Sequence, residues 1–183
     1  MNIFYLHKDP KIAAQMQINK HVVKMILESA QLLSTAHRVI DGFEEIKLSI
    51  NGRRLKTWTH PNPTLNSLLY QSTHVNHPCA IWVRQSNENY MWLYEHFKAL
   101  CEEYTRRYKK IHATDLKLSL TLQHLPEDIP YKDFTEPPLA MLDIYKASDA
   151  VQSYRNYYEG EKLDKGNTEE KERYFSFIVN DGN

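Results

Sequence analysis

The chain has 183 residues, with 23 Lys plus Arg and 23 Asp plus Glu, so its formal net charge at neutral pH is zero. This balance argues against charge-driven, nonspecific binding of nucleic acid, and any site for a polyanion must be a local patch. No apolar run approaches the ~20 residues that span a bilayer. Two cysteines, Cys79 and Cys101, and no secretory leader predict reduced thiols in a cytoplasm. The length fits one domain over 1–183.

The first elements are predicted from local patterns. Ile3–Leu6 is a short apolar run that favours a strand, and Asp9-Pro10 is typical of a helix start, here for a helix to about Gln17. Asn19 is predicted to cap a long helix that ends near Gly42. Because apolar residues cover most of this helix, we expect it to be central.

A narrow polar stripe follows the long helix. At ~100° per residue the following side chains share one quarter of its circumference: His21, Lys24, Glu28, Gln31, Thr35 and Arg38. An acid, an imidazole and a lysine on adjacent turns suit proton transfer and anion binding, which predicts a cleft. The alternative is a solvated strip with a weak Lys24–Glu28 pair.

The next segment changes period. Ile46, Leu48 and Ile50 alternate with polar residues, and Asn51-Gly52 predicts a tight turn back into a second strand from Leu55 to Trp58. Further elements are an irregular stretch over 60–63, a short helix over 65–71, a loop over 72–78 and a helical turn from Pro78 to Arg84.

A second long helix is predicted from Asn87 to Lys109, capped by Ser86. One edge of it aligns Trp92, His96, Glu103 and Arg107. This edge is either a ligand wall, with a guanidinium for phosphate, or an interhelical packing seam.

The last third of the chain is less regular. Residues 115–125 are ambiguous, with a preference for helix, and 126–138 form either an ordered wrap or a mobile lid. Ser148 caps a helix through Tyr158, and the tail over 160–183 is partly flexible unless its aromatic residues dock it. The predicted fold is therefore mainly α, a single domain of two long helices packed with several shorter ones, plus one small β-hairpin.

Several histidines invite other interpretations. His37 lies on the apolar arc and is expected to be a hydrogen-bonded core histidine. His74 and His77 have a His-x-x-His spacing, but without a matched carboxylate or cysteine pair we expect no metal. Asn76 and His77 better suit anion binding at a helix N-terminus. Phosphate loops, dinucleotide fingerprints and paired CxxC motifs do not occur, so no cofactor is expected.

Three segments carry a resemblance to known families: KHVVKMILESAQLLSTAHR (20–38), NHPCAIWVRQSNENYMWL (76–93) and SYRNYY (153–158). Along most of its length the chain resembles a family of tailed-phage proteins, notably marine ones, with no established activity. It is more distantly similar to pyrimidine-dimer DNA glycosylases of the endonuclease V type, whose catalytic glutamate follows a DNA-contacting histidine by seven positions. His21 and Glu28 have that spacing.

That second resemblance implies a mainly helical enzyme whose nucleophile is the α-amine of a processed N-terminus. The chain departs from the pattern at two places. Met1 precedes Asn2, a poor context for methionine removal, and Leu27 stands where the glycosylase motif has an arginine.

The resulting prediction is a DNA- or nucleotide-acting enzyme of a phage-infected bacterial cytoplasm, glycosylase-like, with Glu28 as acid/base and His21 orienting it or the substrate. The residues expected to contact phosphate or nucleic acid are Lys24, Gln31, Arg38, Asn76, His77, Arg84 and Arg107. Two alternatives stay open. One is a noncatalytic accessory protein that binds a partner through a Tyr-rich surface. The other is a small nucleotide-binding enzyme that grips phosphate with the 72–78 loop.

Overall fold

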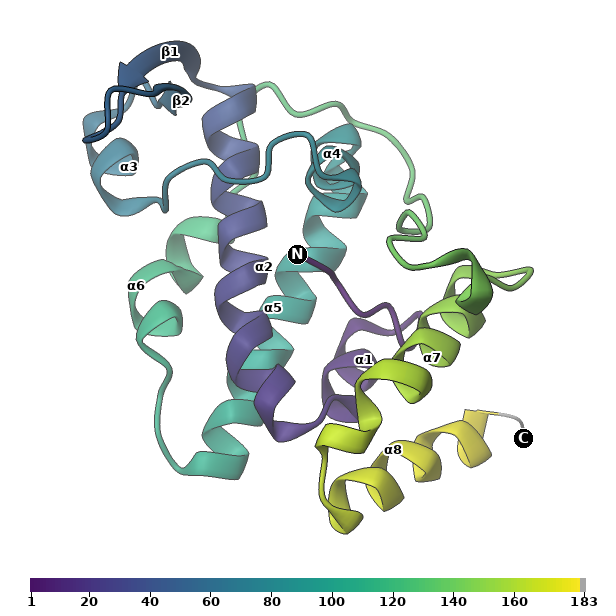
Figure 1. Cartoon of the computed structure of the whole chain (residues 1–183). Coiled ribbons are helices and arrows are strands. Elements are labelled where there is room, and N and C mark those ends of the chain that lie inside the picture. The colour runs from purple at the N-terminus through teal and green to yellow at the C-terminus, as the bar shows by residue number, and fades with distance from the viewer. Residues whose placement is uncertain (182–183) are drawn as a thin grey trace.

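Two long helices pack along each other at the centre of the molecule, as the computed structural model shows for residues 1–181 (Figure 1). They are α2 (Asn19–Ile40) and α5 (Asn87–Tyr108). The other helices are α1 (Pro10–Met16), α3 (Pro63–Leu68), α4 (Pro78–Gln85), α6 (Ala113–Leu122), α7 (Ala150–Glu161), α8 (Thr168–Asp181) and the short 3₁₀ turns η1 (Asp143–Tyr145) and η2 (Leu163–Lys165). One antiparallel hairpin completes the fold, so the predicted mainly α class is confirmed.

The N-terminal end of α2 is capped from far along the chain. Ile18, not Asn19, is the cap residue and makes no side-chain hydrogen bond, so the predicted local cap is wrong. Instead, the backbone N–H of Asn19 donates to a carboxylate oxygen of Glu170 in α8. A carboxylate at a helix N-terminus also interacts favourably with the helix dipole. The tail of the chain is thus fixed to the central helix.

At the other end, α2 stops at Ile40 and the chain turns sharply at Gly42. A Cβ atom on Gly42 would lie 2.3 Å from the carbonyl oxygen of Arg38 and 2.8 Å from that of Thr59. Both contacts are with backbone, so only glycine permits this close approach of the hairpin to the helix.

The polar stripe of α2 is buried at both ends, at His21 and from Thr35 onward, and is open in its middle. The Lys24 side chain is 65% exposed, whereas Thr35 and Arg38 are 0% and 1% exposed. The segment after α3 covers the later part of the stripe, where Thr35 and Thr73 exchange hydrogen bonds. The middle of the stripe, with Lys24, Glu28 and Gln31, is therefore the part most open to a ligand.

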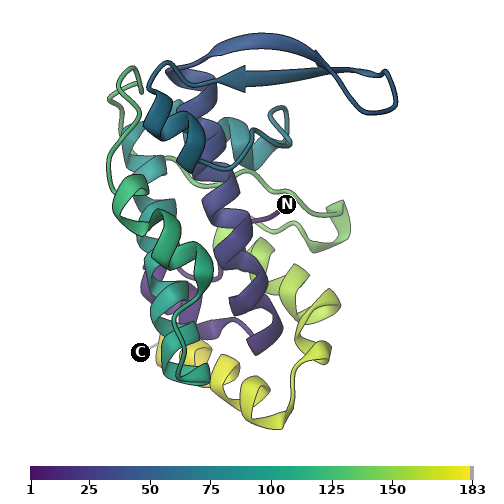
Figure 2. The ribbon, with the colours of Figure 1, turned by 90° about the vertical axis from the view of Figure 1, so that its left-hand side faces the viewer.

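The hairpin pairs β1 (Phe43–Leu48) with β2 (Arg54–Thr59) and stands away from the helical body (Figure 2). Its register joins Phe43 to Thr59 and Leu48 to Arg54, so the connection is longer than the predicted two-residue turn. Gly52 adopts φ +72°, which glycine accommodates without strain.

Residues 2–6 are buried, but 3–6 do not form the predicted strand, because no second strand lies beside them in the part of the chain that the structure describes. Ile3, Phe4, Tyr5 and Leu6 are at most 5% exposed and insert between helices. The ring of Phe4 stacks on His21 of α2, and Tyr5 packs on Trp92 of α5.

Several predicted boundaries shift by a few residues. α3 begins at Pro63 because Asn62 caps it, and α7 is capped by Asp149 rather than Ser148. Residues 113–122 are helical, which confirms the preferred interpretation of that ambiguous segment.

The proline-rich segment 126–138 wraps over α4 and α5 (Figure 1). The Trp82 indole N–H donates to the carbonyl of Thr135, and Asn89 bonds Thr135 through both its amide nitrogen and oxygen. These contacts fit the ordered wrap rather than the mobile lid.

The tail forms η2 and α8, and Tyr174 is fully buried against Tyr158, so an aromatic residue docks it as expected. Residues 182–183, the end of the segment expected to be partly flexible, lie outside the described residues.

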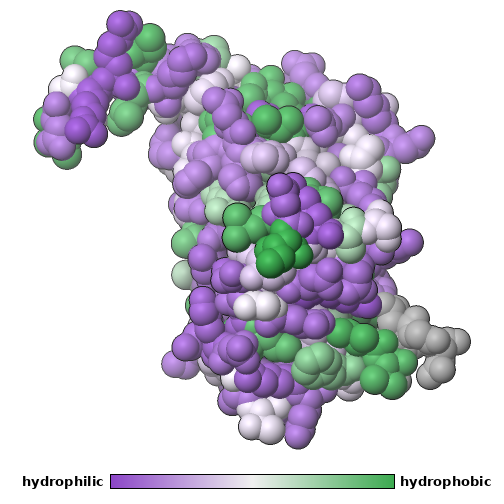
Figure 3. All heavy atoms as spheres, turned by 45° about the vertical axis from the view of Figure 1, so that its right-hand side comes forward, coloured by the Kyte–Doolittle hydropathy of each residue, from purple (hydrophilic) through white to green (hydrophobic). Residues whose placement is uncertain are grey.

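Part of the tyrosine content belongs to the core and cannot contribute to a binding surface. Five tyrosines are at most 1% exposed: Tyr5, Tyr90, Tyr154, Tyr158 and Tyr174. The surface on the side of α7 is mostly hydrophilic, with apolar side chains gathered on α8 (Figure 3). No helix within residues 1–181 is both long and apolar enough to cross a membrane.

Candidate active site at the chain start

A sharp bend at Phe4 directs the start of the chain to the middle of α2 (Figure 1). Phe4 has φ +54°, an uncommon conformation for a bulky residue, and the amide of Leu6 donates to the carbonyl of Phe4 at 2.8 Å. Burial of the Phe4 ring between His21 and Tyr158 holds the bend in place. Strained backbone of this kind often lies at functional sites.

Asn2 then fixes the first peptide. Its side-chain oxygen accepts hydrogen bonds from the amides of Ile3 and Phe4, and its side-chain nitrogen donates to the carbonyl of Ala140 at 3.1 Å. The residue is 8% exposed. The backbone nitrogen of Asn2 is consequently held in one position.

That nitrogen faces the carboxylate of Glu28. The Asn2 backbone N–H donates to Glu28 Oε2 at 3.2 Å, and Lys24 Nζ lies 3.2 Å from Glu28 Oε1. The Glu28 side chain is 14% exposed, so it is largely shielded but not sealed. The Glu28 carboxylate, the first residues of the chain and the Lys24 ammonium group therefore meet at the open middle of the stripe.

His77 lies close to the same place. Its Nδ1 accepts from the amide of Cys79 and so caps α4. Burial lowers the pKa of His77 below its ordinary value, and the positive α-amino group of the chain lowers it further, while Glu28 opposes the change. The charges of Glu28 and of the N-terminus both reach this imidazole. The neighbouring Asn76 is exposed and Gln31, three residues after Glu28, is half-buried.

His21 points to a different partner than expected. Its Nδ1 lies 2.7 Å from the hydroxyl of Tyr158, which also accepts the amide of Ile18. The Tyr158 hydroxyl therefore donates its proton to Nδ1, and the proton of the neutral imidazole sits on Nε2. Two helical turns, ~10 Å, separate His21 from Glu28. His21 thus does not orient Glu28 directly.

Lysines from α2 and from the last part of the chain lie near enough to His21 to act on its pKa. Burial lowers the pKa of His21 to about 4, and positive charges on Lys162, Lys24 and Lys165 add to the effect. Lys162 and Lys165 were not identified from the sequence, because they lie more than 130 positions from His21 and only the docking of α7 brings them near. A local basic patch therefore exists on this neutral chain.

Arg38 has a structural role. All five guanidinium N–H groups donate to acceptors within the protein, namely the carbonyls of Trp58, Asn66, Leu69 and Tyr70 and the side chain of Asn66. No donor is left for a phosphate, so its predicted contact with nucleic acid is wrong.

Arg107 belongs to the packing seam. Its side chain is 6% exposed and donates to Glu103, Asn19 and the carbonyls of Gln15 and Gln17. His96 on the same edge is fully buried. The seam interpretation of this edge is correct and the ligand wall is not. Arg84 is half-buried and donates a hydrogen bond to the carbonyl of Val75. This bond ties the 72–78 loop to α4.

Comparison with known proteins fits this geometry. Residues 1–116 match the family described as pyrimidine dimer DNA glycosylase, and this range includes His21, Glu28 and the buried chain start. No curated protein and no solved structure matches the chain. Because the matched range is more than half of the 183 residues, the chain belongs to the pyrimidine dimer DNA glycosylase family.

Proposed function

We propose that the protein excises damaged pyrimidines from DNA, with an amine at its N-terminus as the nucleophile and Glu28 as the general acid and base. One contact supports this function above all: the Asn2 backbone nitrogen lies 3.2 Å from Glu28 Oε2. A nucleophile and its base are expected at this separation.

The chemistry needs few groups. The amine nitrogen attacks C1′ of the damaged nucleotide, and the bond from C1′ to the base breaks with its electron pair leaving on the base. Glu28 takes the proton that the amine loses and returns it to the ring oxygen as the sugar opens. The product is a protonated Schiff base between the N-terminus and the sugar, which water hydrolyses either directly or after β-elimination has cleaved the strand at the 3′ phosphate.

Two nitrogens are candidates for the nucleophile. Removal of Met1 would turn the Asn2 nitrogen into an α-amine that already lies beside Glu28. If Met1 is retained, the α-amine is that of Met1, one residue before Asn2. Its charge is close enough to act on His77 and Cys79. The intact mass of the purified protein distinguishes the two.

Positive charge would hold the damaged strand. Leu27, 40% exposed, stands where the glycosylase motif has an arginine. Lys24, Lys162 and Lys165 supply positive charge around His21, and Gln31, Asn76 and His77 offer polar contacts to phosphate or base. The His21 Nε2–H would donate to the substrate, which must leave the base stack to reach Glu28. A phage origin would place this reaction in the cytoplasm of an infected bacterium.

The variant Glu28→Gln tests the role of the carboxylate. An amide keeps the shape and can still accept a hydrogen bond from Asn2, but it cannot take a proton. We expect excision from an oligonucleotide duplex with one cyclobutane thymine dimer to fall at least ~100-fold, with DNA binding and the unfolding midpoint unchanged.

Glu95→Gln, on the exposed side of α5, is the matched control and should keep full activity. Excision by Glu28→Gln at the wild-type rate would reject the assignment.

A further inference from the structure

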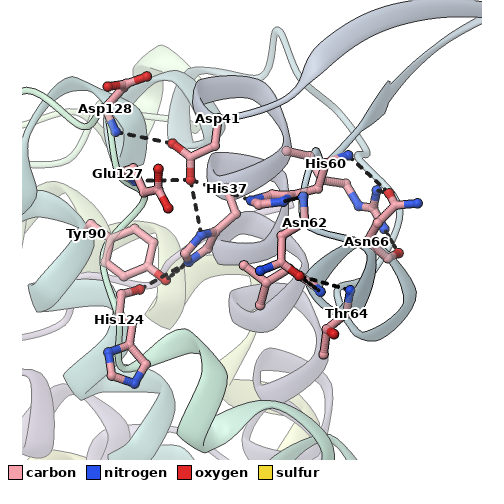
Figure 4. A network of polar contacts seen from close by, with 12 residues as sticks. His37, Asp41, His60, Asn62, Thr64, Asn66, Tyr90, His124, Glu127 and Asp128 are labelled. Atoms are coloured by element: carbon pink, nitrogen blue, oxygen red, sulfur yellow. Dashed lines mark hydrogen bonds and ion pairs between the residues drawn. The ribbon is translucent and has the colours of Figure 1, made fainter.

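Three further side chains converge at the C-terminal end of α2, away from the candidate active site (Figure 4). His37 and Asp41 are one helical turn apart, and His60 follows β2. His37 Nδ1 and His60 Nε2 lie 3.7 Å and 3.6 Å from Asp41 Oδ2. All three donor atoms lie within 4.8 Å of one another.

The two imidazole nitrogens that face this point have no hydrogen-bond partner. His37 Nδ1 and His60 Nε2 are buried and unpaired, and the residues are 3% and 5% exposed. An unpaired buried polar atom costs free energy and calls for an explanation. Here two such atoms point to the same carboxylate.

The outer contacts of His37 suit a metal ligand. Its Nε2 contacts the Tyr90 hydroxyl at 2.9 Å and the His124 carbonyl at 3.1 Å. Tyr90 donates its own proton to Leu122, so His37 Nε2 must carry a proton and Nδ1 presents a lone pair. Metal-bound histidines are usually oriented in this way by a carbonyl on the second nitrogen.

Backbone amides fix the carboxylate of Asp41. The backbone amides of Glu127 and Asp128 donate to its two carboxylate oxygens at 3.1 Å and 3.2 Å. A cavity of about 480 Å³ opens beside it, lined by His37, Asp41, His124 and Glu127 among others. The cavity therefore reaches two of the three side chains, His37 and Asp41, and has room for an additional ligand such as water.

We infer that His37, Asp41 and His60 form a binding site for a divalent transition metal of the Zn²⁺ class, with an open position toward the cavity. Two imidazoles and one carboxylate match the preference of such metals, whereas Ca²⁺ and Mg²⁺ favour oxygen-only sites. Distances of 3.6 and 3.7 Å are close to the ~3.4 Å edge of a tetrahedron with ~2.1 Å bonds.

Binding would change the state of His60. Its Nδ1 accepts the amide of Asn62 at 3.1 Å, so the proton of the neutral ring is on Nε2. A metal on Nε2 moves that proton to Nδ1 and displaces the Asn62 contact, which weakens the affinity about tenfold relative to a preformed site.

The metal would act as a structural clamp. It joins the end of α2 to the residue after β2, next to the 123–128 segment that holds Asp41. Nine residues, or ~13 Å of helix, separate His37 from Glu28, so the metal takes no part in excision.

The test titrates ZnCl₂ into the full chain after treatment with EDTA, using calorimetry and thermal unfolding, and repeats it with Co²⁺, whose visible absorption reports imidazole ligation. We expect one equivalent of Zn²⁺ to bind and to raise the unfolding midpoint. His60→Gln and Asp41→Asn should each weaken binding at least ~10-fold.

His74→Gln, an exposed histidine outside the cluster, is the control and should bind as wild type does. Stoichiometric binding that survives in His60→Gln, or no saturable binding by the wild type, would overturn the inference. Because the hydrogen bond of the His60 side chain is one that it accepts from the neighbouring amide of Asn62, the His60 variant remains informative even if Asp41→Asn does not fold.

Discussion

Individual histidines in this protein have different functions that depend on their partners. His96 of α5 is completely buried against α1. Its Nδ1 donates to the carbonyl of Pro10, and its Nε2 contacts the Gln17 amide. His21 is buried beside a tyrosine hydroxyl and lysines. In both, burial lowers the pKa to about 4, so both are neutral at physiological pH.

His96 predicts a loss of stability in mild acid. Its pKa is about 4 in the folded chain and ~6.5 when unfolded, so below pH ~6.5 only the unfolded chain takes up this proton. The free energy of unfolding should therefore decrease as the pH falls from ~6.5 to ~4, by up to ~3 kcal/mol from this residue. Urea denaturation at several pH values measures it.

The variant His96→Gln should show a shallower pH dependence, with the share of His21 remaining. Equal slopes for the variant and the wild type would show that His96 does not contribute.

At the residue scale, the sequence predicts that Glu28 and His21 share one face of a long helix, and both residues do lie on α2. The sequence could not identify the partner of Glu28, because the Asn2 contact depends on the bend at Phe4 and on tertiary burial. The position of Arg38 on the polar stripe likewise predicts a contact with nucleic acid, whereas its donors are all used within the protein. A polar stripe shows which side chains share a face, but not which later segment covers that face.

The end of α2, the hairpin and the loop after α3 depend on one another. Arg38 joins them through bonds to the carbonyls of Trp58 in β2 and of Asn66, Leu69 and Tyr70. Gly42 permits the close contact at the turn. The sequence predicts the helix end from the helical period and Gly42, and the hairpin from the alternation of Ile46, Leu48 and Ile50 before Asn51-Gly52. How these elements pack against one another cannot be predicted without knowing that the Arg38 guanidinium is buried between them.

Arg38→Ala should therefore destabilise the protein strongly. Loss of the side chain leaves several buried carbonyls without donors, and we expect the free energy of unfolding to fall by about 3 to 5 kcal/mol. Chemical denaturation gives the value, and Arg53→Ala on the exposed hairpin is the matched control, with an expected change within ~0.5 kcal/mol. A loss below 1 kcal/mol for Arg38→Ala would contradict the anchoring role.

On the scale of the whole molecule, segments from both ends of the chain build the candidate site. The first residues run between α2, α5 and α7, and the docking of α7, η2 and α8 brings Lys162 and Lys165 to His21. The matched family range ends at residue 116, so these lysines lie outside it. A chain without net charge thereby gains a group of lysines around His21.

The double variant Lys162→Ala/Lys165→Ala tests this group of lysines. Each lost phosphate contact lowers the slope of log K against log salt by about 0.9, so the pair should lower it by about 2 and weaken binding to duplex DNA at low salt. Lys117→Ala, exposed on α6 on the other side of α2, should leave the slope unchanged. Identical slopes for all three proteins would place DNA on another surface.

The most direct measurement traps the covalent intermediate. The protein is incubated with thymine-dimer duplex in the presence of sodium borohydride, which reduces a Schiff base to a stable amine, and the crosslinked peptide is identified by mass spectrometry. We predict a crosslink on the α-amine of the N-terminal peptide that disappears in Glu28→Gln. Excision without any trapped species, or a crosslink confined to a lysine side chain, would contradict the pairing of the N-terminus with Glu28.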